Sequence, residues 1–166
     1  MSALLFIHVL ISLIGIAAGF VVMVGMLRSG RMRAMTAVFL LTTILTSVTG
    51  FPLPAERFLP SHAVGILSLI TLALASVAYY PKRLRGHWRW IYVVTAIVSQ
   101  YFNCFVGVVQ AFEHIPALKS SAPTQTEPPF AIAQGIVLLF FIAWGIVAVR
   151  RFHPNTSVQP QMNADK

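Results

Sequence analysis

The stretch QYFNCFVGVVQAFEH occupies residues 100–114 and overlaps an apolar segment at 90–112. At 100° per residue, its polar and small side chains fall within an arc of about 80°, so they form one seam along an otherwise apolar helix. The seam consists of Gln100, Asn103, Gly107, Gln110 and His114. Amide side chains in a membrane span are tolerated where they face protein or a water-filled cavity. The stretch therefore predicts a membrane helix whose polar seam faces the inside of a helix bundle.

Composition supports a membrane protein. Of the 166 residues, 57% are hydrophobic and only 10% are charged, and the mean hydropathy is +0.79. Soluble domains carry about 25% charged residues. In a membrane protein, the net charge of +8 is first a signal of topology, and it does not indicate nucleic-acid binding. The expected partners are the lipid bilayer and other membrane subunits. The single cysteine, Cys104, excludes an intramolecular disulfide and fits a small buried hydrophobe.

The apolar runs divide the chain into five expected spans, each near the roughly 20 residues that a helix needs to cross the hydrocarbon core. The runs are 4–27, 34–53, 62–80, 90–112 and 130–149. We therefore predict an all-α, five-helix transmembrane domain over residues 1–151. The polar, proline-containing remainder at 152–166 predicts a disordered cytoplasmic tail.

Basic residues predict the orientation of these spans. Ten of the twelve Lys and Arg residues lie after the first span, after the third span and in the tail. The alternate loops, 54–61 and 113–129, hold only Arg57 and Lys119. Because cytoplasmic loops carry the excess of Lys and Arg, the N-terminus is expected outside and the C-terminus in the cytoplasm.

With this topology, four helices place polar side chains at one depth in the outer leaflet. These candidate ligand-binding residues are His8, His62, Gln110, His114 and Gln134. Imidazole is a common ligand of metals and haem iron, so His8, His62 and His114 are the candidates for any metal. A quinone or another amphipathic molecule is a second candidate ligand, and hydrogen bonding at the interface is the plainest role. The proline-rich residues 122–129 are expected to form a stiff cover over this layer.

The second span is rich in hydroxyls, and Thr42, Thr46 and Thr49 share one face. These hydroxyls can bond to their own helix or to neighbouring helices, or they can line a hydrated path. The chain lacks the P-loop, GxSxG, HExxH and paired CxxC motifs. We therefore assign no catalytic residue.

Three short stretches carry a resemblance to a known group of proteins. They are LPSHAVG at 59–65, QAF at 110–112 and APTQTEPPF at 122–130. On these stretches, and over nearly its whole length to Arg151, the chain resembles small uncharacterised polytopic inner-membrane proteins of proteobacteria. The resemblance implies a bacterial cytoplasmic membrane and supplies no activity and no functional residue.

Three functions from different classes remain. The first is a non-enzymatic membrane subunit or binder of a small amphipathic ligand, with quinone or haem as the cofactor candidates, that uses the outer His and Gln layer. The second is a small permease with a polar path along the fourth-span seam and the second-span hydroxyls. The third is a membrane-embedded enzyme.

Overall fold

The computed structural model describes residues 3–51 and 60–154, and for residues 3 and 60–62 it describes the backbone only. Throughout these residues the regular structure is helical. The elements are α1 (Ala3–Leu27), α2 (Arg33–Gly50), α3 (Pro60–Tyr79), α4 (Trp88–His114), α5 (Pro116–Ser121) and α6 (Pro128–Arg151).

Four of these helices are long and apolar enough to cross a membrane, namely α1, α2, α4 and α6. The chain is therefore built as a multi-pass membrane protein, and the all-α helix bundle expected from the sequence is confirmed. The expected third span, 62–80, falls on α3, which is apolar over its fully described residues, Ala63–Tyr79.

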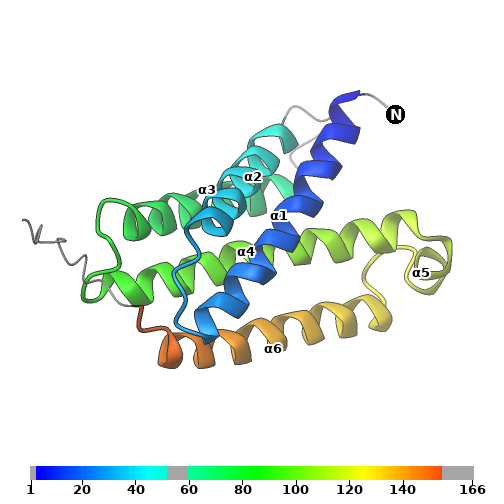
Figure 1. Ribbon diagram of the computed structural model, residues 1–166. Coiled ribbons are helices and arrows are strands. Elements are labelled where there is room, and N and C mark those ends of the chain that lie inside the picture. Colours follow the sequence, from blue (N-terminus) through cyan, green and yellow to red (C-terminus); the bar gives the residue numbers. More distant parts are fainter. Residues whose placement is uncertain (1–2, 52–59, 155–166) are drawn as a thin grey trace, which may run out of the picture.

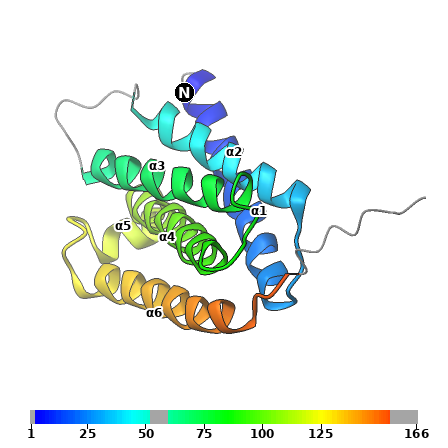
Figure 2. The same ribbon diagram turned by 90° about the vertical axis from the view of Figure 1, so that its left-hand side faces the viewer.

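Helix α4 lies at the centre of the bundle, because it packs against α1, α3 and α6. Helix α1 packs mainly against α2, and α3 packs mainly against α4. Figure 2 shows α3 and α6 on different sides of α4, with the α1–α2 pair beside them. This central position explains why α4 carries the polar seam, since its faces meet several neighbours instead of lipid.

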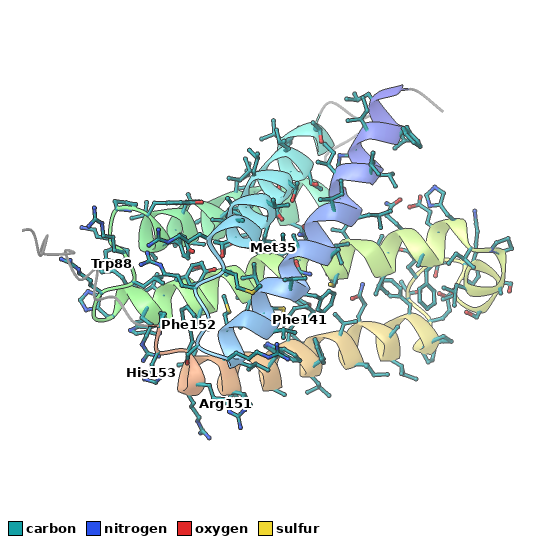
Figure 3. The ribbon with its side chains drawn as sticks, viewed as in Figure 1. Met35, Trp88, Phe141, Arg151, Phe152 and His153 are labelled. Carbon is teal, nitrogen blue, oxygen red and sulfur yellow. The ribbon has the colours of Figure 1, made fainter. Side chains whose placement is uncertain are left out.

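The core is concentrated toward the end of the bundle where α1 ends and α4 begins. The fully buried large side chains of α1, α2 and α4 include Met23, Phe39 and Tyr92. Phe141 of α6 is 4% exposed and its ring lies 6.2 Å from Phe20 and 5.9 Å from Tyr101, and Figure 3 shows it pointing from α6 into the bundle. Burial of aromatic and aliphatic side chains thus ties α6 to both α1 and α4.

The three basic segments of the sequence meet at this same end. Arg31 donates to the carbonyl of Tyr79 at 3.4 Å, and its guanidinium lies 5.2 Å from the centre of the Tyr79 ring. Arg89 of α4 donates to the carbonyls of Val149 and Phe152, at 2.9 and 2.6 Å. The α1–α2 connection, the end of α3 and the end of α6 are therefore held together.

Ser29 closes α1 and also contacts α6. The N–H of Gly30 donates to the carbonyl of Gly25 at 2.9 Å and that of Ser29 to Met26 at 3.1 Å, which is a Schellman cap. Ser29 occupies the left-handed position of this cap, with φ of 54°, where glycine is the usual residue. Its hydroxyl donates to the carbonyl of Arg151 at 2.6 Å and accepts from the N–H of His153 at 3.2 Å. A serine is therefore used here because its side chain bonds to α6.

Two expectations about the connections need correction. The loop at 113–129 contains the short helix α5. Pro116 is compatible with this helix because it stands at the first position, where the missing N–H costs nothing. Phe152 does not belong to a disordered tail, since it is 1% exposed and its ring lies 5.9 Å from that of Tyr92. The rest of the expected tail, 155–166, and most of the 54–61 loop lie outside the described residues.

Candidate functional site

Gln100 is the centre of the polar seam. Its side chain is fully buried, at 0% exposure, and its Nε2 donates to the carbonyl of Ile16 in α1 at 2.8 Å. Its Oε1 is buried and has no hydrogen-bond partner in the described part of the chain. A Cβ added at Gly19 would collide with the Gln100 amide. The glycine therefore makes room for a glutamine that joins α1 to α4.

Neighbouring polar residues join α4 to two more helices. Asn103 Nδ2 donates to Thr43 Oγ1 of α2 at 3.1 Å, and Thr43 is fully buried. The hydroxyls of Ser99 and Thr71 of α3 lie 2.7 Å apart. Interhelical bonds of this kind contribute about 0.6 kcal/mol each on average. The seam residues Gln100 and Asn103 thus face protein, as the sequence predicts.

A second series of polar contacts joins α1 to α2. His8 Nδ1 lies 2.8 Å from Thr49 Oγ1, and the hydroxyl of Ser12 donates to Thr46 Oγ1 at 3.3 Å. Thr42 and Thr49 also donate to carbonyls of their own helix, at Val38 and Leu45. The hydroxyls of α2 therefore bond both to the neighbouring helix α1 and to carbonyls of α2 itself. His8 is half-buried in this contact.

The outer end of the seam differs from the inner end. Gly107, Gln110 and His114 are exposed. Gln110 lies 3.5 Å from Glu113 Oε2, and His114 Nδ1 lies 3.1 Å from the carbonyl of Gln110. The expectation that Gln110 faces protein is therefore wrong, because α1 and α2 lie away from the end of α4 that leads into α5 (Figure 1).

Gln134 lies on α6 and contacts α4. Its Nε2 donates to the carbonyl of Phe105 at 3.1 Å, while its buried Oε1 has no partner among the residues described. His62 lies in the first turn of α3, and its side chain is outside the described residues.

The contacts of the candidate residues thus link His8 with α2, Gln134 with α4, and Gln110 with His114. Over residues 3–51 and 60–154, no group of three His, Cys, Asp or Glu side chains gathers to hold a metal.

The described residues enclose two hollows, and none of the candidate ligand-binding residues lines either of them. One is an apolar groove of about 440 Å³ between α4 and α6. The other, of about 300 Å³, lies beneath the proline-rich loop and is lined by Phe112, Glu113, Lys119, Pro123, Thr124 and Gln125. Gln125 Nε2 donates to the carbonyl of Val109 at 3.2 Å, so this loop folds back onto the end of α4.

Glu127 organises the loop that precedes α6. Its carboxylate accepts bonds from the N–H and hydroxyl of Thr124, at 3.2 and 2.9 Å, and from the N–H of Thr126 at 3.1 Å. Desolvation raises the pKa of the carboxyl. The hydrogen bonds from the Thr124 side chain and from backbone N–H groups outweigh this effect and leave the pKa of Glu127 lowered. The ionised carboxylate therefore favours the folded loop.

We expect the order of this loop to depend on pH. The pKa of Glu127 is lower in the folded loop than its usual value of 4.5. Its ionised carboxylate therefore stabilises the folded loop at pH values above 4.5, and this stabilisation is lost as the pH falls through the folded-state pKa. Hydrogen exchange at the Thr124 and Thr126 amides, corrected for the intrinsic rate, should accelerate in acid. Glu127→Gln should exchange faster at neutral pH and lose this acid response. Glu113→Gln is the control, and an equal effect of that change would contradict the assignment.

Sequence reasoning missed several residues that connect the helices. Ser99 and Thr71 were missed because single hydroxyls in spans usually bond to their own helix. Arg89 was read as a topology signal, although its position at the start of α4 also allows it to reach the carbonyls at the end of α6. The groove was missed because its apolar lining gives no signal in the sequence.

No family model, no curated protein and no solved structure matches the chain.

Proposed function

We propose that the chain is a non-enzymatic subunit of a bacterial cytoplasmic membrane that binds a small amphipathic ligand, of the quinone or haem class, in its outer half. One observation carries this proposal. The largest fully buried side chains all lie level with Gln100 and Thr43 or nearer the basic end. Beyond that level Ser68 is buried, at 3% exposure, but the candidate residues His8, Gln110 and Gln134 are half-buried or exposed. Such groups in a membrane protein mark functional surfaces.

The chemistry of these groups suits an amphipathic ligand. Imidazole binds a quinone oxygen as a hydrogen-bond partner or haem iron as an axial ligand. The buried Oε1 of Gln134 is a hydrogen-bond acceptor to which the described residues offer no donor. A quinol hydroxyl would supply that donor, and the surrounding apolar helices would hold the rest of the ligand.

The permease alternative has one observation in its favour, which is the series of hydroxyls along α2. These hydroxyls are bonded to other helices or to their own carbonyls, as at Thr43, Thr46 and Thr49. A path along them would also have to pass the level of Phe39, Tyr92 and Gln100, each at most 1% exposed. This tight packing favours a binder over a permease.

Ligand binding is tested with purified full-length protein in detergent. Decylubiquinone and haemin are added separately, and the bound amount is measured by absorbance after gel filtration, including the Soret region for haemin. One of them should be retained at a saturable stoichiometry. The variants His8→Leu and Gln134→Leu should each bind the retained probe roughly tenfold more weakly, because the loss of a polar contact of about 1.4 kcal/mol corresponds to a tenfold change in affinity. Leu139→Ala, at a lipid-facing position 67% exposed, is the control. Retention of neither probe would refute the proposal.

We also propose that α3 is a fifth span and that the N-terminus lies outside. Helix α3 starts beyond the far end of α2 and finishes at Tyr79, beside Arg31 in the connection that precedes α2. It thus returns across the bundle in the direction opposite to α2 (Figure 1). The basic segments gathered at this end support a cytoplasmic location for it.

Reporter fusions test this topology. Alkaline phosphatase, which is active outside, and green fluorescent protein, which is fluorescent in the cytoplasm, are fused after residues 57, 82 and 166. We expect phosphatase activity only at 57 and fluorescence at 82 and 166. The same reporter active at both 57 and 82 would mean that α3 does not cross. Phosphatase activity at 166 would reverse the orientation.

A further inference from the structure

The groove between α4 and α6 has the shape of a site for one hydrocarbon chain. Its volume of about 440 Å³ falls in the range of about 300–1,000 Å³ that is typical of ligand sites. Helix α4 contributes residues such as Val94 and Tyr101, and α6 contributes residues from Leu138 to Arg150. Gly145 leaves the groove hollow, because a Cβ there would meet only Ile97, at 3.8 Å.

The length of the groove matches one leaflet of a bilayer. Arg150 follows Leu138 by twelve positions, which at 1.5 Å per residue correspond to about 18 Å along the axis of α6. Half of the hydrocarbon core is about 15 Å thick. An acyl chain that lies along the groove would therefore place its headgroup at Arg150.

The end of the groove at Arg150 is positively charged. Arg150 is exposed and lines the groove, and Arg89 donates to the backbone of Val149, another lining residue, at 2.9 Å. Trp90, 47% exposed at the start of α4, is of a residue type that is enriched where membrane proteins contact headgroups. The carboxylates in the described residues, Glu113 and Glu127, lie at the opposite ends of the same two helices.

We infer that this groove binds an anionic phospholipid of the leaflet at the basic end, with one acyl chain against Gly145 and the phosphate at Arg150. The apolar walls hold the chain, and the guanidinium of Arg150 selects a headgroup with net negative charge. Two features distinguish binding at this site from the general electrostatic attraction of lipids to a basic surface. It includes an apolar groove of matching length, and it depends on one arginine among several. The site is independent of the ligand proposed for the outer half.

The test uses full-length protein in detergent and native mass spectrometry with two lipids that share the same chains. These are dioleoyl-phosphatidylglycerol, which is anionic, and dioleoyl-phosphatidylcholine, which is zwitterionic. Three variants are compared with the parent protein. Arg150→Gln removes the charge at the groove, Gly145→Leu fills the groove, and Arg28→Gln removes an exposed arginine at the same end of the bundle but outside the groove.

The parent protein should bind phosphatidylglycerol at least about fivefold more tightly than phosphatidylcholine, as expected for a basic residue near an anionic headgroup. Arg150→Gln should remove most of this preference. Gly145→Leu should weaken both lipids, with a melting temperature measured to confirm that it folds, and Arg28→Gln should change neither affinity by more than about twofold. Equal binding of the two lipids by the parent protein would overturn the inference. So would an equal effect of Arg28→Gln and Arg150→Gln, which would show a diffuse electrostatic attraction.

Discussion

Replacing Gly19 with leucine is expected to destabilise the protein more than any other single change at a glycine of α1. The new side chain would occupy the space of the fully buried Gln100 amide. Overpacking of a core costs about 1–3 kcal/mol, and displacement of Gln100 would also break its 2.8 Å bond to Ile16. The measurement is the free energy of unfolding in mixed micelles.

Two further variants make this prediction specific. Gly135→Leu adds the same side chain to α6, where a Cβ would meet nothing within 4 Å, and should change stability little. The double variant Gly19→Leu with Gln100→Ala should recover part of the loss, because the leucine can then fill the space that the glutamine vacates. Coupling between residues in contact is about 0.5–3 kcal/mol. Simple addition of the two single effects would mean that Gly19 and Gln100 do not share this space.

Replacing Arg89 with methionine is expected to loosen α6 from α4. The side chain keeps much of its length, but the two bonds to the carbonyls of Val149 and Phe152 are lost. Both carbonyls lie at the C-terminal end of α6, where helix carbonyls lack partners within their own helix. Hydrogen bonds to a charged group contribute about 1.5–3 kcal/mol each, so we expect a loss of this order in the free energy of unfolding. Hydrogen exchange in the last turns of α6 should accelerate.

The control for Arg89 is another arginine of the same end. Arg85 is exposed, so Arg85→Met should change stability by no more than about 0.5 kcal/mol. Arg89→Lys keeps the charge but cannot donate two bonds from one planar group, and it should be intermediate. If Arg85→Met and Arg89→Met are equally destabilising, the effect is one of net charge and not of these two bonds.

The helices could be predicted from the sequence within a few residues. The expected span at 90–112 is α4, Trp88–His114, and the expected span at 130–149 is α6, Pro128–Arg151. Length and hydropathy suffice for this because a helix that crosses a membrane must satisfy its own backbone bonds. Helix α5 was not expected, because prolines around it predict an irregular loop and only Pro116 at the first helical position permits a turn of helix.

The candidate site was less predictable. The periodicity of α4 correctly placed Gln100 and Asn103 against protein, but it extended the same conclusion to Gln110, which is exposed. Sequence periodicity predicts which face of a helix packs against its neighbours. It does not predict how far along the helix a neighbour covers that face. Coverage depends on the crossing of α1 over α4 near Gly19, a tertiary fact that requires the position of both helices. A shared outer-leaflet site formed by His8, His62, Gln110 and His114 stays a prediction.

The bonds of Ser29 imply an order of assembly during synthesis. The α1–α2 hairpin leaves the ribosome before α6, yet the hydroxyl of Ser29 bonds to the backbone of Arg151 and His153. Until the last helix has entered the membrane, the φ of 54° that Ser29 adopts in the folded protein is unfavourable for serine and lacks the two bonds that offset its cost. The first hairpin therefore reaches its final form only when the last helix docks, so a ribosome-bound chain that stops before residue 151 should have an incompletely closed bundle.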